Sequence, residues 1–211
     1  MTAIEAVISD FGGVLTTPLI DSYTAVQESS GIPMEELGKA MGKIWERDGS
    51  HPLFELETGR MSEATFLGDL GEELSEQLGR TVSMQDFGER YFEHLHANEP
   101  MIDYMRVLRD RGYKLGICTN NVREWEQRWK SKLPVDEIFS VVVDSAFVGA
   151  RKPEPKIYEI TLERLGVPAQ AALFIDDVEL NCTAARELGL SAVWFRCTEQ
   201  AIEEIEAVLG A

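Results

Sequence analysis

Residues 3–15, AIEAVISDFGGVL, combine a short apolar run, an acidic residue and a pair of glycines. The run from Ala3 to Ser9 is predicted to form a β-strand, because it is short, apolar and followed by a turn signal. Asp10 stands at the carboxyl end of this strand, and the glycines at positions 12 and 13 permit a tight turn and close approach of the backbone to a ligand. A strand that ends on an acid indicates a candidate site.

Two patterns follow along the chain. From about residue 18 to residue 96 the sequence has helical patterning. Its predicted helix starts are Pro33, Ser62 and Ser83, and its predicted helix ends are Gly31, Gly49 and Gly79. After residue 100, strands and helices alternate. The predicted strands are 113–118, 138–143, 171–175 and 191–195, and the predicted helices are 101–111, 122–131, 154–165, 179–188 and 198–209.

The alternation of strands and helices implies a parallel sheet that helices cover on both faces. The apolar segments AALFI (171–175) and SAVWF (191–195) lack inside–outside alternation, as expected for strands buried on both sides. The sequence therefore predicts an α/β fold with a doubly wound parallel sheet. Its core domain comprises residues 1–15 and 98–211, and residues 16–97 form an inserted α-helical cap.

The composition excludes several classes of partner. The chain has 211 residues, of which 44% are hydrophobic, and this suffices for a complete hydrophobic core. A formal net charge of −17 argues against nucleic acids and anionic membrane surfaces, because both are bound through Lys and Arg. The same negative field opposes an anionic substrate, so a phosphate-binding site must carry its own local positive charge.

The sequence predicts a cytoplasmic protein. No apolar run approaches the ~18 residues of a membrane span, and the stretch from Met1 to Asp10 lacks the basic and apolar regions of a signal peptide. Cys118, Cys182 and Cys197 are odd in number and lack C-x-x-C spacing, so they indicate neither a disulfide framework nor a zinc site. A reducing compartment is therefore expected.

Four polar clusters fall at the carboxyl ends of predicted strands, where ligands bind in open parallel sheets. They are Asp10, Thr119-Asn120-Asn121, Arg151-Lys152-Pro153 and Asp176-Asp177. A single acid at a strand end can simply cap a helix, whereas four clusters that converge on one edge of a sheet indicate a ligand site.

The three acids Asp10, Asp176 and Asp177 require a positive charge among them. Two carboxylates ~4 Å apart repel each other by a few kcal/mol at an effective dielectric constant of about 20. A hard cation with oxygen ligands meets this requirement, and Mg²⁺ prefers carboxylates, waters and phosphate oxygens. Mg²⁺ is therefore the predicted cofactor.

Positive charge and neutral donors are also present for a phosphate. Lys152 supplies a compact positive charge, while Thr119 offers a hydroxyl and Asn120 an amide. Together with the acids, these residues predict a phosphoryl-transfer site with a carboxylate nucleophile, acting on a small phosphorylated metabolite.

The clusters lie in segments that resemble a known family. ISDFGGVL, ICTNN, RKPEPKIY and LFIDDVELN are similar, in this order, to the four motifs of the haloacid dehalogenase-like hydrolase superfamily. The resemblance covers the whole chain if residues 16–97 are the helical cap that the family inserts after its first motif. The last two motifs look especially like the phosphatase half of mammalian soluble epoxide hydrolase and related bacterial sugar-phosphate phosphatases.

The resemblance implies roles for the acids and for one backbone group. Asp10 would be the nucleophile that becomes an aspartyl phosphate, and it would bind Mg²⁺ together with the backbone carbonyl of Gly12. Asp177 would bind the metal directly, and Asp176 would bind it directly or through water. Asn181 stands where many members carry Asp, which implies a role behind these ligands.

The remaining implied roles concern the phosphoryl group. Thr119 and Asn120 would hold the phosphate, and Lys152 would neutralise Asp10 and the transferring group. The catalytic residues implied are therefore Asp10 and Lys152.

Gly12 departs from the family pattern, because most of its phosphatases carry an acid two residues after the nucleophile. That acid protonates the leaving group, and positioned acid–base catalysis is typically worth ~10²–10⁴ in rate. A phosphatase without it should prefer leaving groups that need little protonation, such as anomeric or acyl phosphates. Slow hydrolysis of the aspartyl phosphate, seen as a burst of released alcohol, is a second expectation.

Three alternatives remain open. A haloacid dehalogenase would use Asp10 to displace halide without a metal, although Asp176 and Asp177 would then lack a cation. A phosphonatase would require a cap lysine such as Lys39 or Lys43 to form a Schiff base. A binding protein would keep the fold and the metal site but turn over too slowly to act as an enzyme.

Two further residue types are interpreted as structural. Trp125 and Trp129 lie four residues apart and are predicted to pack, and Cys118 is predicted to be a small buried residue within a strand. Trp45, Arg47 and Arg60 of the cap are candidates for substrate selection that the sequence does not rank.

Overall fold

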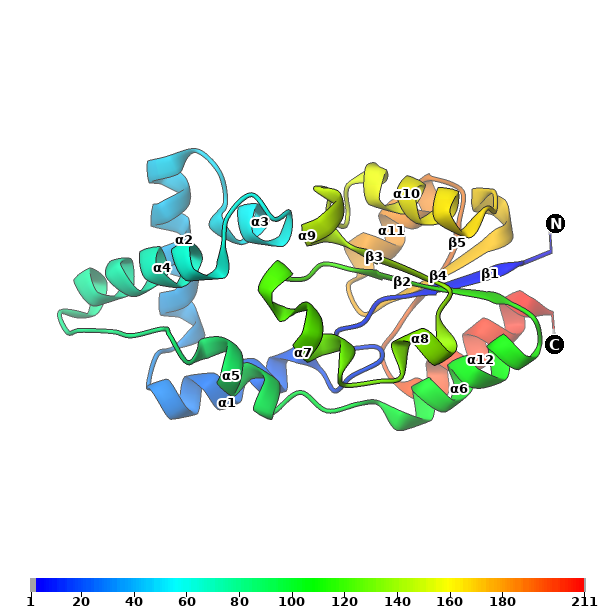
Figure 1. Ribbon diagram of the computed structural model, residues 1–211, viewed down its shortest axis with the longest axis horizontal. Coiled ribbons are helices and arrows are strands. Elements are labelled where there is room, and N and C mark those ends of the chain that lie inside the picture. Colours follow the sequence, from blue (N-terminus) through cyan, green and yellow to red (C-terminus); the bar gives the residue numbers. More distant parts are fainter. Residues whose placement is uncertain (1–2, 211) are drawn as a thin grey trace.

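The computed structural model describes residues 3–210 and contains one parallel sheet of five strands (Figure 1). Their order in the sheet is β3-β2-β1-β4-β5. The strands are β1 (Ala6–Ser9), β2 (Lys114–Thr119), β3 (Val141–Asp144), β4 (Ala172–Asp176) and β5 (Ser191–Trp194). β1 lies at the centre, with Ser9 level with Ile117 of β2 and Ile175 of β4. The carboxyl ends of all five strands therefore meet at one edge.

Helices cover both faces of this sheet. The elements that follow β1 in the α/β part are α6 (Glu99–Asp110), η1 (Arg123–Trp125), α7 (Glu126–Lys130), α8 (Val135–Ile138), α9 (Ser145–Val148), α10 (Pro155–Leu165), η2 (Ala169–Ala171), α11 (Glu179–Glu187) and α12 (Thr198–Leu209). Alternate strand residues face opposite sides, so Val7 joins the core under α6 and α12 while Ile8 joins the core under α10 and α11. The predicted doubly wound α/β fold is confirmed.

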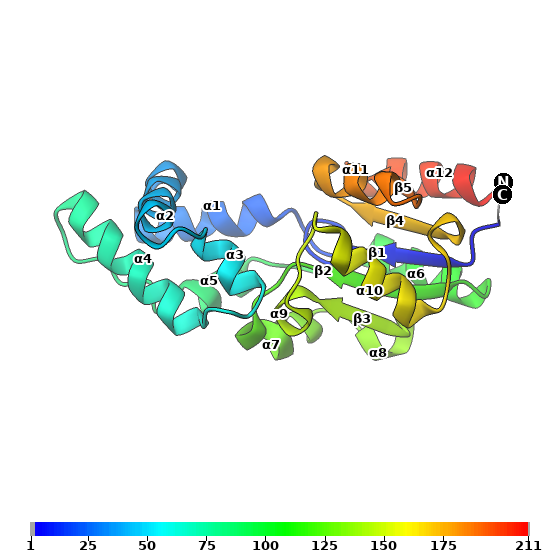
Figure 2. The same cartoon turned by 90° about the horizontal axis from the view of Figure 1, so that it is seen from above.

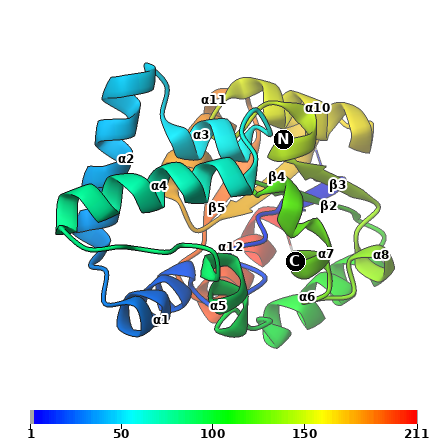
Figure 3. The ribbon, with the colours of Figure 1, turned by 60° about the vertical axis from the view of Figure 1, so that its left-hand side comes forward.

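A helical segment, residues 16–97, lies beyond the carboxyl ends of the strands (Figures 1 and 2). Its helices are α1 (Leu19–Ser30), α2 (Met34–Asp48), α3 (Pro52–Glu57), α4 (Glu63–Leu78) and α5 (Phe87–Glu93). Figure 3 shows α1 beside α5 and α2 beside α4. Every helix among residues 3–210 is too short or too polar to span a bilayer.

The chain enters and leaves the helical segment at two paired positions. Thr16 and Ala97 form an isolated antiparallel bridge. The Thr17 N–H donates to the His96 carbonyl at 2.8 Å, and the Asn98 N–H donates to the Leu15 carbonyl at 2.9 Å. The two crossings thus run side by side.

Most predicted boundaries lie within two residues of the observed ones, and helices end at Gly31, Gly49 and Gly79 as predicted. The helix start at Ser83 is wrong, because α5 begins at Phe87. The segment before it is extended and held against α4, where the Val82 N–H donates to Ser75 Oγ at 2.9 Å.

Two strand starts are also wrong. The strand expected from Ala3 begins at Ala6. The strand expected at 138–143 begins only at Val141, because Ile138 ends the short helix α8.

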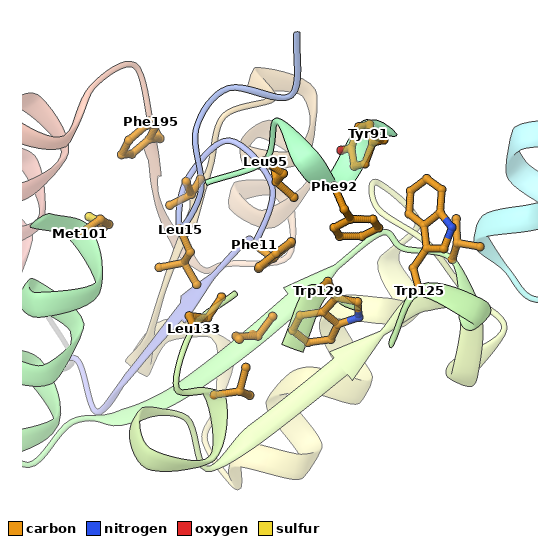
Figure 4. Packing of buried hydrophobic residues seen from close by; sticks show 14 of the residues in the cluster. Phe11, Leu15, Tyr91, Phe92, Leu95, Met101, Trp125, Trp129, Leu133 and Phe195 are labelled. Atoms are coloured by element: carbon orange, nitrogen blue, oxygen red, sulfur yellow. The ribbon is translucent and has the colours of Figure 1, made fainter. Parts of the chain in front are cut away.

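The two tryptophans and Cys118 pack as predicted. Trp129 and Cys118 are fully buried, and the Trp129 ring lies 5.0 Å from that of Phe11 (Figure 4). Trp125 stacks on Tyr91 of α5 with ring centroids 5.2 Å apart. Phe11 directly follows Asp10, so its contact with Trp129 anchors the loop after β1 in the core.

Candidate active site

The four polar clusters converge at the carboxyl edge of the sheet around Lys152. Its ammonium nitrogen lies 2.7 Å from Asp10 Oδ1 and 2.7 Å from Asp176 Oδ2. The Lys152 side chain is only 1% exposed, and that of Asp176 is completely buried. One lysine therefore links the ends of β1 and β4 from the loop that precedes α10.

Asp177 completes a cluster of three acids with Asp10 and Asp176. One carboxylate oxygen of each lies within 4.8 Å of the others, which is a separation that a single cation can bridge. Asp176 Oδ1 is fixed by the Val178 N–H at 2.8 Å and by Asn181 Nδ2 at 3.0 Å. Asn181 thus lies behind the cluster and orients Asp176.

The side chains of the site carry more negative than positive charge, because three carboxylates surround one lysine. Burial raises the pKa of Asp10 to about 7, Lys152 opposes this rise, and Asp176 and Asp177 add to it. Burial also raises the pKa of Asp177 to about 6, with a further contribution from Asp176. Burial lowers the pKa of Lys152, but the attraction of Asp10 and Asp176 outweighs this and raises it overall. Three acids around one lysine leave room for a further positive charge.

The loop after β1 depends on its two glycines. Gly13 has φ of +77°, and a Cβ atom there would lie 2.3 Å from Asp177 Oδ2, so only glycine fits. A Cβ atom at Gly12 would lie 3.0 Å from two methyl carbons of Leu19. The side of Gly12 where family members carry an acid is therefore occupied by an apolar side chain.

The Gly12 carbonyl oxygen accepts no hydrogen bond from any residue between 3 and 210. The three carboxylates form a set of oxygen donors within 4.8 Å of one another, which is the ligand type that Mg²⁺ prefers. The residues present therefore fit a hard divalent cation.

Asn120 has a different environment from the one that the sequence suggested. Its Oδ1 accepts from the Lys152 N–H at 2.7 Å, and its Nδ2 donates to the Lys152 carbonyl at 3.0 Å. The amide thus holds the backbone of Lys152 as well as standing near the site. Thr119 is buried at the end of β2, and its hydroxyl donates to the Asn120 carbonyl at 3.5 Å.

Sequence reasoning missed Glu57 of α3, which lies near Lys152. Its Oε2 is 2.6 Å from Arg151 Nε, and both side chains are largely buried. The Arg151 guanidinium also lies over the Phe54 ring, 3.9 Å from its centroid. Arg151 belonged to a recognised cluster, but an isolated glutamate in a helical segment of many acids gave no signal.

The two cap arginines singled out from the sequence form ion pairs at the surface, whereas Trp45 is exposed and its ring meets that of His51. Arg47 pairs with Asp48 and Asp69, and Arg60 pairs with Glu55. These ion pairs do not involve the site.

Comparison with known proteins places this arrangement in a family. The model of the haloacid dehalogenase-like hydrolases matches residues 4–189. The chain belongs to this family of hydrolases.

Curated relatives include phosphatases. Bifunctional epoxide hydrolase 2 of Sus scrofa is 27% identical over 99% of this chain and 39% of its own length. The chain thus spans about two fifths of that relative. Phosphatase MT3486 of Mycobacterium tuberculosis is 30% identical over 90% of this chain and 86% of its own length.

Solved structures share the fold. A HAD family enzyme from Bacteroides thetaiotaomicron, in complex with magnesium and inorganic phosphate, is 24% identical with a TM-score of 0.63, covering 90% of this chain and 93% of that chain. A 2-haloacid dehalogenase from Pseudomonas syringae is 17% identical with a TM-score of 0.67, covering 98% of both. Because phosphatases and dehalogenases share the fold, the site must distinguish them.

Proposed function

We propose that this chain is a Mg²⁺-dependent phosphatase of a small phosphorylated metabolite, acting through an aspartyl phosphate on Asp10. The observation that carries this proposal is the cluster of Asp10, Asp176 and Asp177 within 4.8 Å, with Lys152 as its only buried cation in residues 3–210. Three acids with one lysine favour a chemistry in which a divalent cation and a phosphoryl group complete the charge balance.

The metal would be held by Asp10, Asp176, Asp177 and the Gly12 carbonyl. A bound divalent cation would offset the charge of the phosphoryl group and hold Asp10 ionised at neutral pH. The second effect matters because burial raises the pKa of Asp10 to about 7 and so favours its protonated form. A protonated carboxyl is a poor nucleophile.

Asp10 is prepared for attack by its neighbours. Lys152 and the Phe11 N–H both bind Oδ1, at 2.7 and 2.6 Å, which orients the carboxylate and leaves Oδ2 without a hydrogen bond in residues 3–210. An Asp10 oxygen attacks phosphorus, and the bond from phosphorus to the leaving oxygen breaks, with its electron pair going to that oxygen. Water then attacks the aspartyl phosphate, which releases inorganic phosphate and restores the Asp10 carboxylate.

Lys152 and β2 would hold the phosphoryl group. Lys152 neutralises negative charge on Asp10 and on the group in transfer. Thr119 and Asn120 would bind its remaining oxygens. The hydrogen bonds between the Asn120 amide and the Lys152 backbone hold Asn120 and Lys152 in a fixed position relative to each other. The helical segment, residues 16–97, would act as a cap over the core domain of residues 1–15 and 98–211.

The alternatives have less support. A dehalogenase without metal would leave the Asp176 and Asp177 carboxylates adjacent with no cation between them. A phosphonatase requires a lysine with a lowered pKa, whereas Glu35 and Glu36 raise the pKa of Lys39 to about 12. Lys43 is half exposed and pairs with Glu73.

The test is release of phosphate from p-nitrophenyl phosphate with Mg²⁺, with EDTA, and in the Asp10→Asn variant. We expect EDTA to abolish release and the variant to lose at least ~10³-fold in kcat. The matched control is Asp103→Asn, an exposed acid of α6 that pairs with Arg106, which should retain wild-type rates. Wild-type protein that is inert with Mg²⁺ would contradict the proposal and leave a binding protein or a dehalogenase. Phosphate release that persists in EDTA would contradict the dependence on a metal.

A further inference from the structure

Trp194, the last residue of β5, is hydrogen-bonded to the backbone of one of the three acids. Its indole Nε1 donates to the carbonyl oxygen of Asp177 at 3.0 Å. In the sheet Trp194 lies level with Asp176, and the N–H of the next residue, Phe195, donates to the Asp176 carbonyl at 2.9 Å. The end of β5 therefore holds the backbone of both consecutive acids, one through its main chain and one through a side chain.

The three acids differ in how firmly their carboxylates are held. Lys152 binds the carboxylates of Asp10 and Asp176, at 2.7 Å in each case. Asn181 binds that of Asp176 as well. The carboxylate of Asp177 accepts no hydrogen bond from another residue in the range 3–210, and it forms no ion pair there. The position of this carboxylate therefore depends on the peptide that carries it.

Repulsion between the acids acts on Asp177 whenever no cation is bound. One of its carboxylate oxygens lies within 4.8 Å of oxygens of Asp10 and Asp176, and like charges at such a separation repel each other. The residues that follow, 178–180, are exposed, so packing does little to hold the turn from that side. The hydrogen bond from the indole is thus the side-chain contact that opposes this repulsion.

Trp194 is well anchored for this purpose. Its backbone pairs with β4, and its carbonyl accepts from Nε2 of Gln200, in the first turn of α12, at 3.2 Å. The Arg196 guanidinium lies 5.8 Å from the centroid of its ring. The indole therefore extends to Asp177 from a backbone that is fixed on two sides.

We propose that Trp194 is a positioning residue for the metal, which holds Asp177 in the orientation in which its carboxylate binds Mg²⁺. This inference rests on the metal site of the function proposed above. With the hydrogen bond in place, the ligand is oriented before the cation arrives. Without it, part of the binding free energy is used to bring Asp177 back against the repulsion, so Mg²⁺ binds more weakly.

The experiment compares Mg²⁺ titrations of wild type and Trp194→Phe, a variant that keeps an aromatic ring and loses the N–H donor. The two readouts are thermal melts, which need no turnover, and release of phosphate from p-nitrophenyl phosphate. We expect the variant to need about three- to tenfold more Mg²⁺ for the same rise in Tm and for half-maximal turnover. At saturating Mg²⁺ its kcat should lie within about twofold of wild type, because the filled site is the same.

Tyr104→Phe is the matched control. It also removes one hydrogen bond of an aromatic side chain, the one from the Tyr104 hydroxyl to Glu206 at 2.8 Å, which joins α6 to α12. It should leave the Mg²⁺ dependence unchanged. In EDTA both variants should melt within about 6 °C of wild type, because each has lost a single hydrogen bond. A shift in Mg²⁺ dependence confined to Trp194→Phe therefore reports on the metal site and not on folding.

The outcomes distinguish this inference from the proposed function. Equal Mg²⁺ dependence in wild type and Trp194→Phe overturns the role of Trp194 and leaves the phosphatase proposal intact. A lower kcat at saturating Mg²⁺ with unchanged Mg²⁺ dependence overturns it too, as does an equal shift in Tyr104→Phe. Wild-type protein whose Tm and turnover do not respond to Mg²⁺ refutes the proposed metal-dependent function, and this inference with it.

Discussion

Replacing Asp177 by Asn should stabilise the metal-free protein at neutral pH. Burial, with a contribution from Asp176, raises the pKa of Asp177 from 3.8 to about 6 in the folded chain. Between these values the folded state binds more protons than the unfolded state, so stability falls as the pH rises through this interval. At pH 7 the full penalty is present, and below pH ~4 it is absent.

The size of the effect follows from the pKa shift. A shift of about two units corresponds to roughly 3 kcal/mol at pH 7. Since the Asp177 carboxylate is only partly buried, screening by solvent reduces this to roughly 1–2 kcal/mol. In a chain of this length each kcal/mol moves Tm by about 2–4 °C, so we expect a gain of roughly 2–8 °C.

Thermal melts in EDTA at pH 7 and pH 4 measure this gain, and melts with added Mg²⁺ measure the role of Asp177 as a ligand. Asp177→Asn should melt above wild type at pH 7 and level with it at pH 4. Mg²⁺ should raise the Tm of wild type more than that of the variant, because ligand binding stabilises the folded state. Asp103→Asn serves as the control for loss of an acid. If Asp177→Asn melted at or below wild type at pH 7 in EDTA, the electrostatic reasoning would be refuted.

Three further substitutions test the remaining contacts. Lys152→Met leaves two carboxylates without their shared cation and should lower the free energy of unfolding by about 3–5 kcal/mol at pH 7 in urea titrations; no loss would contradict the charge balance described. Gly13→Ala forces a Cβ atom against Asp177 at positive φ and should lower Tm and weaken Mg²⁺ binding in calorimetry, whereas unchanged binding would mean that the loop relaxes. Gly12→Asp combined with Leu19→Ala restores an acid and should raise turnover of alkyl phosphates by up to ~10²-fold, and an unchanged rate would show that protonation is not limiting.

Much of the fold was predictable because its signals are local. Apolar runs marked the strands, and the glycines at 31, 49 and 79 marked helix ends by a requirement of the backbone itself. The start at Ser83 was not predictable in this way. Its hydroxyl accepts the Gln85 N–H at 3.5 Å in a turn, and the preceding residues are held by Ser75 of another helix, which is a tertiary contact.

The site, too, has residues that local sequence signals predict and residues that only tertiary packing brings into place. The structure brings together Asp10, Lys152 and Asp176, as expected from the rule that ligands bind at the carboxyl edge of a parallel sheet. Glu57 could not be found from the sequence, because its proximity to Lys152 depends on how α3 packs on α9. The attachment of the Asn120 amide to the Lys152 backbone is likewise a product of packing between two loops. The roles of these residues in catalysis stay predictions.

The bridge between Thr16 and Ala97 has an evolutionary consequence. The 80 residues between these two positions begin and end at neighbouring points. They therefore form a closed loop, and changing its length does not move the ends that join the sheet. Doubling the length of such a loop costs only about 0.6 kcal/mol in closure entropy. Lineages can therefore lengthen, trim or exchange these helices while the strands that carry the acids keep their register.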